Sequence, residues 1–351
     1  MNASHFSPQG SSPDSSGANV LPALEASSDA SRRAAWHVRE LGVILVLLLE
    51  IALFAFLVQR SSGRWLFVQR TNLLDIAVDA AVIGVACVGV TLVIIAGGID
   101  LSVGGAIALA SVVVAGLLRA GWPVGGAIIV TLLVGAVVGT IAALLVTRAE
   151  LPPFIATLAL LLITRGVAFA FTRGDNWSIS TAPAFTDTFG NGALLSIPYP
   201  ALVLVLLTLI AAWFLTRSAW GRQVFAVGGN AVAARYAGVD VRRVTLSVYV
   251  LSGLAAALAG IVYAARYGLG HSTAATGYEL DVVAAAVVGG ASLSGGRGSI
   301  VGAVLGALIF ATLRKGLSQV PGGATYNQVI VGLVVIAAVL LDQLTRRRVA
   351  R

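Results

Sequence analysis

Ten long apolar segments divide this chain and limit what it can fold into. A helix needs about twenty mainly apolar residues to cross the hydrocarbon core of a bilayer, since each residue adds about 1.5 Å along the axis. Apolar segments near this length lie at 41–58, 73–97, 102–119, 123–146, 153–171, 198–215, 244–265, 279–291, 299–313 and 326–342. We therefore predict an all-α, polytopic membrane protein with about ten transmembrane helices.

The composition supports the same fold class. Hydrophobic residues make up 58% of the chain and charged residues only 11%, whereas roughly a quarter of the residues are charged in soluble domains. The 40 glycines are expected where helices pack closely in lipid. The single cysteine, Cys87, lies in an apolar segment and excludes an internal disulfide framework.

Two of the apolar segments, 279–291 and 299–313, are short. They are separated by the polar, glycine-rich stretch 292–298. We predict short or re-entrant helices here, which a membrane protein tolerates only where the backbone is buried in protein.

The ends of the chain differ from its centre. Residues 1–38 begin with a stretch rich in Ser, Ala, Pro and Gly that has few large apolar side chains, and they are predicted to form a disordered cytoplasmic tail. A transmembrane domain is expected over 39–345. It includes a cytoplasmic loop at 216–243 and is followed by a basic cytoplasmic tail at 346–351.

The basic residues indicate the orientation. With ten spans and a cytoplasmic N-terminus, fourteen of the 23 Lys and Arg residues lie inside, eight lie outside, and Arg165 falls within a span. Basic residues are enriched on the cytoplasmic side of membrane proteins, so both termini are expected there. Because these residues are scattered between spans, the net charge of +8 does not indicate nucleic-acid binding.

A break in the apolar pattern marks a first candidate site. Residues 97–105 read GGIDLSVGG, and Asp100 or Ser102 is suited to cap the helix that follows. Glycines at 97, 98 and 104 also permit close approach of a neighbouring backbone or a solute. Gly97, Gly98, Asp100, Ser102 and Gly104 are therefore candidates for a translocation path.

Charged residues inside the apolar segments form a second group. Asp75 and Asp79 lie near one end of a span, where solvation at the interface is as good an explanation as a pore role. Arg165 lies deeper, and a charge at that depth usually has a partner or faces a cavity. We expect a buried partner for it, such as a carboxylate. The alternative is that Arg165 extends toward the membrane surface.

The cytoplasmic loop contains a short predicted helix. Asn230 is suited to an N-cap, Ala233 and Ala234 favour helix, and Gly238 is suited to a C-terminal stop. Such a helix could dock into a groove on a cytoplasmic partner or rest on lipid headgroups, and the loop alone leaves both open.

Several motifs of enzymes and metal proteins do not occur. The sequence contains no Gly-Lys pair, hence no phosphate-binding loop of the GxxxxGK[ST] type. Its three histidines lack the spacing of metal ligands, and no GxSxG nucleophile motif is present. We therefore expect no enzymatic activity, cofactor or metal in this chain, and energy for transport would come from elsewhere.

Taken together, these segments resemble the permeases of ribose- and xylose-type ABC sugar importers from about residue 66 to 343. The resemblance rests on five stretches in the same order: GGIDLSVG at 97–104, LPPFIATL at 151–158, the loop 221–238, ELD at 279–281 with VGG at 288–290, and AVLLD at 338–342. One departure is Lys315, where such permeases commonly carry asparagine before Gly-Leu.

The resemblance implies partners, a location and site residues. A pair of permeases in the bacterial inner membrane would enclose the path, a separate cytoplasmic ATPase would bind ATP, and a periplasmic binding protein would deliver the sugar. Thr157 and Arg165 would join the candidate path. Coupling to the ATPase would involve the loop residues Gly221, Arg222, Gly228, Asn230, Ala233, Ala234 and Gly238.

Three other functions compete with this interpretation. The first is an ABC permease for branched-chain amino acids, which the GGIDLS string disfavours. The second is a self-powered secondary transporter, which usually has ion sites at the bilayer midplane, whereas the carboxylates here lie near membrane ends. The third is a membrane enzyme, which the missing catalytic motifs disfavour.

Overall fold

Helices occupy all ten apolar segments of the sequence. The computed structural model describes residues 20–180 and 182–349. Its long helices are α1 (Val20–Ser62), α2 (Arg70–Ile95), α3 (Val103–Arg119), α4 (Val124–Thr147), α5 (Pro153–Thr172), α7 (Tyr199–Arg217), α10 (Val241–Tyr267), α11 (Tyr278–Val288), α12 (Ile300–Gln319) and α13 (Gly323–Val349). The predicted all-α membrane fold is thereby confirmed.

The number of crossings stays a prediction. Within the described part of the chain, seven helices are long and apolar enough to cross a membrane. The apolar stretches of α3 and α13 are shorter, and α11 has only 11 residues.

The first helix begins earlier than the sequence analysis predicted. Residues 20–38 are helical in α1, where we expected a disordered tail, and alanine and other good helix formers are frequent among them. Residues 1–19 of that tail lie outside the described residues. The chain divides into two compact units, Met1–Gly42 and Val43–Arg351.

Helix α2 forms the core of the unit Val43–Arg351. It contacts α7, α10, α11 and α12 and is buried along nearly all of its length from Ile76 onward. A helix that is apolar all round is expected to be buried. The outer helices instead expose large apolar side chains on one side, as in α4 (Ile129, Leu133, Val137), α5 (Leu162, Ile163, Phe169) and α7 (Leu206, Leu209, Trp213).

Glycines allow α4 and α10 to pack backbone against backbone. A methyl group added at Gly139 would lie 2.9 Å from Cα of Val250, and one at Gly253 would lie 2.8 Å from the backbone nitrogen of Gly139. Small residues have this function at helix interfaces in membranes, as the glycine content predicted.

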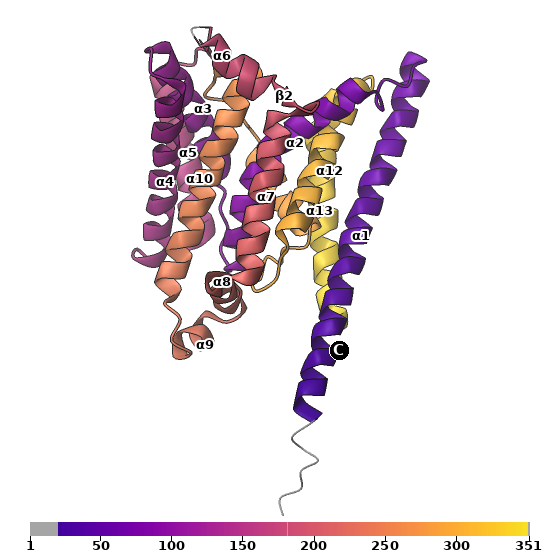
Figure 1. Ribbon diagram of the computed structural model, residues 1–351, viewed down its shortest axis with the longest axis vertical. Coiled ribbons are helices and arrows are strands. Elements are labelled where there is room, and N and C mark those ends of the chain that lie inside the picture. The colour runs from indigo at the N-terminus through magenta and orange to yellow at the C-terminus, as the bar shows by residue number, and fades with distance from the viewer. Residues whose placement is uncertain (1–19, 181, 350–351) are drawn as a thin grey trace, which may run out of the picture. The chain divides into compact units, whose positions relative to one another are not determined.

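Short elements gather at the two ends of this unit, as Figure 1 shows. One end carries β1 (Trp177–Ser178), α6 (Pro183–Phe185), the π-helix η1 (Thr186–Gly190), β2 (Ala193–Leu194) and β3 (Ile197–Pro198). The opposite end carries α8 (Ala219–Gly229) and α9 (Ala231–Tyr236). The structure thus places the residues 172–197 and the loop 216–243 at opposite ends of the unit.

The segment after α10 is helical over only part of its length. Strand β4 (Leu269–Gly270) pairs antiparallel with β1. At the far end of the same segment, the backbone nitrogen of Gly296 donates to the carbonyl of Ile95, over 2.8 Å. Helix α11 accounts for only about 16 Å of this path, roughly half of the ~30 Å hydrocarbon core, and non-helical residues on both sides of it, 268–277 and 289–296, supply the rest.

The prediction for the two short segments is therefore corrected in part. The segment 279–291 contains the short helix α11 of 11 residues, as predicted. The segment 299–313 belongs to the 20-residue helix α12, which is long enough to cross.

Candidate functional site

The turn that contains Asp100 is held from within the chain. The Asp100 side chain is 2% exposed and accepts hydrogen bonds from the backbone nitrogen of Ser102 (2.9 Å), its hydroxyl (2.6 Å) and the Ser252 hydroxyl of α10 (2.7 Å). Ser102 precedes α3 and makes no side-chain capping bond. Asp100 thus closes an Asx-type turn and links it to α10, in place of the predicted helix cap.

The carbonyl of Ile99 in the same turn receives two further donors. The Tyr249 hydroxyl of α10 lies 3.2 Å away and the Thr157 hydroxyl of α5 lies 3.3 Å away. Thr157 is fully buried, and a methyl at Gly98 would lie 2.7 Å from the Tyr249 hydroxyl. Gly98, Asp100, Ser102 and Thr157 therefore converge on one turn, in which they have a positioning role.

Arg165 has the carboxylate partner that its depth indicated. Its Nη2 lies 3.8 Å from Oε2 of Glu279 in α11, and its Nη1 donates to the Thr276 hydroxyl over 3.0 Å. The Glu279 carboxylate occupies the space that a methyl group at Gly104 would need. Gly104 and Arg165 are thus brought together, in a cluster separate from Asp100.

Sequence analysis missed Glu279 and Thr276. Glu279 lies in the ELD stretch at the start of an apolar segment, and that position was a signal for a buried charge pair. No sequence signal identified Thr276 as a site residue, because Thr276 approaches Arg165 only through the non-helical segment before α11.

Glycines bring the loop 216–243 into backbone contact with the ends of apolar helices. Gly228 of α8 is packed so closely that an added methyl would collide with the carbonyl of Ile95 and lie 2.6 Å from the backbone nitrogen of Gly296. A methyl at Gly295 would lie 2.9 Å from Cα of Gly97. We call Gly97, Gly228, Gly295 and Gly296 the glycine joint. It connects α8, the end of α2 and the loop before α12.

The loop helix α9 has the predicted ends. The Asn230 side chain accepts from the backbone nitrogens of Val232 and Ala233, each over 3.0 Å, which confirms it as an N-cap. Gly238 has a φ of +84° beyond the helix, which confirms the stop. At the start of α8, the Ser218 hydroxyl accepts from Gly221 over 2.9 Å.

The outward face of α9 differs from the expected one. Ala234 is 5% exposed and packs in the apolar cluster of Val224, Val244 and Val248, so it supports the helix from inside and is not available to a partner. Val232 is 65% and Tyr236 90% exposed. Sequence analysis missed these two residues, because helical periodicity over six residues did not reveal which face is outward. Arg222 and Ala233 are exposed as well.

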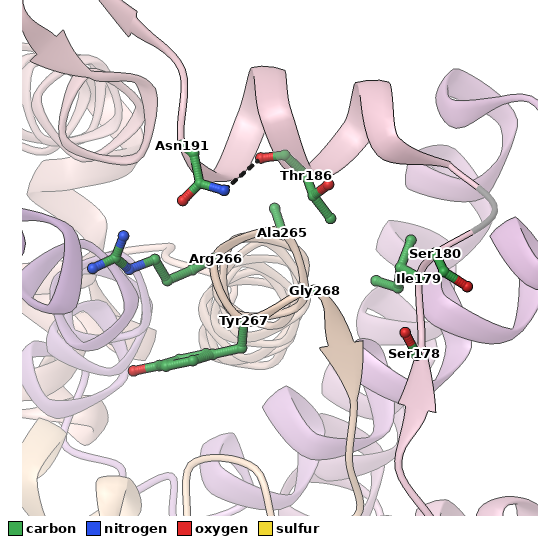
Figure 2. A pocket seen from close by; sticks show the side chains of 9 residues that line it. All are labelled: Ser178, Ile179, Ser180, Thr186, Asn191, Ala265, Arg266, Tyr267 and Gly268. Carbon is green, nitrogen blue, oxygen red and sulfur yellow. Dashed lines mark hydrogen bonds between the residues drawn. The ribbon is translucent and has the colours of Figure 1, made fainter.

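Two recesses lie at opposite ends of the unit. One recess, of about 280 Å³, surrounds the end of α10. It is lined by Ser178, Ile179, Ser180, Thr186, Asn191, Ala265, Arg266, Tyr267 and Gly268. Figure 2 shows the Asn191 side chain donating a hydrogen bond to the Thr186 carbonyl in this recess. The other, of about 330 Å³, lies between α9 and α10 and is lined by Arg235, Val239, Asp240, Val241 and Arg242. Neither contains a residue of the predicted path.

Ion pairs connect α2, α10 and α12. Asp75 of α2 accepts from Arg266 of α10 (2.8 Å) and from Lys315 of α12 (3.3 Å). Lys315, the departure noted in the sequence, therefore pairs with an acidic residue. Across the described residues, no group of three or more His, Cys, Asp or Glu side chains is placed to hold a metal ion.

The apolar helices define a polytopic, all-α membrane protein. Residues 72–339 match the family described as "Branched-chain amino acid transport system / permease component". The chain belongs to this permease family.

Its relatives include importers of sugars. The "Ribose import permease protein RbsC" of Bacillus subtilis (strain 168) is 41% identical over 278 residues, which cover 79% of this chain and 86% of that protein. The protein of the same name from Escherichia coli (strain K12) is 38% identical, with 79% and 87% covered. The "Xylose transport system permease protein XylH" of Escherichia coli (strain K12) is 32% identical, with 88% and 93% covered. No solved structure matches the chain.

Proposed function

We propose that this chain is the membrane-spanning permease subunit of a bacterial ABC importer for a monosaccharide such as ribose or xylose. The observation that carries the proposal is its similarity, over about four fifths of its length, to permeases named for ribose import and xylose transport. The branched-chain amino acid permease stays as the second candidate, because the family description names that substrate.

The proposed importer has further subunits. A second copy of the chain would complete the path in the inner membrane, and a periplasmic binding protein would deliver the sugar. Since the sequence has no phosphate-binding loop, a separate cytoplasmic ATPase would bind and hydrolyse ATP. Both termini would lie in the cytoplasm, in keeping with the excess of basic residues on that side.

The proposed coupling surface is the outward side of α8 and α9. Val232 and Tyr236 project from α9, and an exposed aromatic residue is a frequent anchor of protein interfaces. A displacement of α8 would reach the end of α2 and the loop 292–298 through the glycine joint, because backbone atoms in direct contact there leave no space to absorb the motion. The Asp100 turn follows directly after that end of α2.

Uptake by cells that lack their own ribose, xylose and branched-chain amino acid importers tests the proposal. The chain is expressed with its ATPase and binding protein, and uptake of labelled D-ribose, D-xylose and L-leucine is measured. We expect uptake of one of the two sugars, with no competition by excess leucine. Uptake of leucine without uptake of either sugar would favour the second candidate.

A further inference from the structure

We propose that Arg165, Thr276 and Glu279 form a contact site for sugar hydroxyl groups at the non-helical segment before α11. This inference rests on the proposed function and assigns the chemistry of one point on the path. The three side chains come from α5, from the turns at 272–277 and from the first turn of α11.

The cluster lies well inside the membrane-spanning region. Arg165 is twelve residues beyond the start of α5 at Pro153, which places it about 18 Å along that helix. Polar and charged groups at such a depth rarely face lipid, and they mark substrate pathways more often than other positions do.

The cluster is partly exposed, although its unpaired polar atoms are themselves buried. The side chains of Arg165 and Glu279 are 24% and 14% exposed, and Thr273 and Thr276 beside them are exposed. A polar, accessible surface at this depth needs a polar environment, such as a path enclosed with a second copy of the chain.

Several hydrogen-bonding atoms of the cluster are unsatisfied. In the described residues, Nε and Nη2 of Arg165 and Oε2 of Glu279 are buried and have no hydrogen-bond partner. The 3.8 Å between Nη2 and Oε2 exceeds the length of a direct hydrogen bond. Such buried atoms call for a partner from outside the protein fold.

A neighbouring ion pair on the same helix shows what a closed pair looks like. Asp281, two residues after Glu279, is fully buried and binds the guanidinium of Arg314 at 2.5 Å. The Arg314 guanidinium also stacks over the Tyr278 ring, 4.9 Å from its centroid. The Arg314–Asp281 pair is therefore a direct contact between α11 and α12, although Oδ1 of Asp281 is also buried without a hydrogen-bond partner. The Arg165–Glu279 pair is open in the sense that its charged atoms lie 3.8 Å apart.

A hydroxyl group matches the open pair chemically. It accepts a hydrogen bond from the guanidinium and donates one to the carboxylate, so one sugar hydroxyl satisfies both ions. A second, adjacent hydroxyl can bind another nitrogen of the planar guanidinium, which presents its donors in a fixed fork. An amino acid with an aliphatic side chain offers no such pair of hydroxyls.

The test compares sugars with one hydroxyl removed. Maximal uptake rates are measured for the better substrate of D-ribose and D-xylose and for each of its mono-deoxy analogues, in wild type and in Glu279→Gln. The same binding protein delivers every sugar to both permeases, so its preferences cancel in the ratio of the two rates. Membrane yield is measured alongside.

We expect wild type to transport one deoxy analogue about tenfold more slowly than the parent sugar, the size expected for a hydrogen bond to a charged group. In Glu279→Gln the maximal uptake rate of the parent sugar should fall about tenfold. The uptake rate of that analogue should fall little below its wild-type value. Thr276→Val, which keeps the side-chain volume, is the second variant if Glu279→Gln does not reach the membrane. Arg314→Lys is the matched control and should slow all the sugars by one common factor.

Two results would overturn the site. One is an equal slowing of every sugar in both Glu279→Gln and Thr276→Val, and the other is unchanged uptake in both. Failure of the wild-type complex to take up any sugar would instead count against the proposed function.

Discussion

At the scale of single residues, Asp100 is a structural group. Both of its carboxylate oxygens are engaged by Ser102 and Ser252 within the chain, and the side chain is buried. A role in direct contact with a solute would leave at least one oxygen available. The turn positions α2 and α3, and Asp100 contributes to transport through that position.

Replacement of Asp100 by alanine tests this assignment. Asp100→Ala leaves the hydroxyls of Ser102 and Ser252 without their acceptor, which should destabilise the fold by about 3 kcal/mol. We expect the yield of folded protein in the membrane and the uptake rate to fall in proportion. Fluorescence of a C-terminal tag and sugar uptake measure the two quantities. Normal yield with abolished uptake would show that Asp100 acts on the path itself.

Gly228 and Gly229 form a matched pair of positions. Gly228→Ala introduces a methyl into contact with Ile95 and Gly296, whereas nothing lies within 4 Å of a methyl at Gly229. We expect Gly228→Ala to reduce uptake at least fivefold, because overpacking of this kind costs about 1–3 kcal/mol, and Gly229→Ala to resemble wild type.

The Gly228 variant should still bind the ATPase, since the outward surface of α9 is unchanged. Co-purification of the ATPase with tagged permease measures this. Equal uptake by the two glycine variants would exclude the glycine joint from coupling.

At the scale of elements, the sequence allowed most helices to be predicted and left the orientation of their faces open. Apolar length alone located the ten segments, because lipid demands long apolar helices. The two caps of α9 could also be predicted, since capping depends on neighbouring residues. The buried side of α9 depends on distant residues such as Val244 and Val248, and local pattern could not reveal it.

The break before α11 shows the same limit. Segment 279–291 is apolar enough to read as part of a crossing, but the non-helical residues 268–277 precede it, and the pairing of Gly270 with Trp177 involves a strand nearly a hundred positions away. The Arg165–Glu279 pair depends on this break. The depth of Arg165 indicated that it had a partner, and only the fold identified Glu279.

Helix α9 gives the prediction that belongs to this scale. Tyr236→Ala removes an exposed aromatic side chain from the proposed coupling surface and should weaken ATPase binding by about 2 kcal/mol, roughly 30-fold in Kd. Tyr326→Ala removes a tyrosine that is 61% exposed at the start of α13, and it serves as the control. Retention of the ATPase during purification should drop only for Tyr236→Ala. Wild-type retention in that variant would place the coupling surface elsewhere.

At the scale of the whole molecule, the membrane orientation is the first consequence to test. Single cysteines are introduced in a Cys87→Ala background, at Leu195 in the loop 172–197 and at Arg235 in the loop 216–243. A membrane-impermeant maleimide should label Leu195→Cys in intact spheroplasts and Arg235→Cys only after permeabilisation. Labelling of Arg235→Cys in sealed spheroplasts would reverse the proposed topology.

The central claim is that this chain conducts a sugar and that a partner supplies the energy. The most direct measurement is sugar accumulation in proteoliposomes that contain the purified permease, with or without its ATPase, and with sugar-loaded binding protein on one side. We predict accumulation only when the ATPase, ATP and the binding protein are all present. Accumulation by the permease alone, driven by a proton or sodium gradient, would contradict this account and identify a secondary transporter.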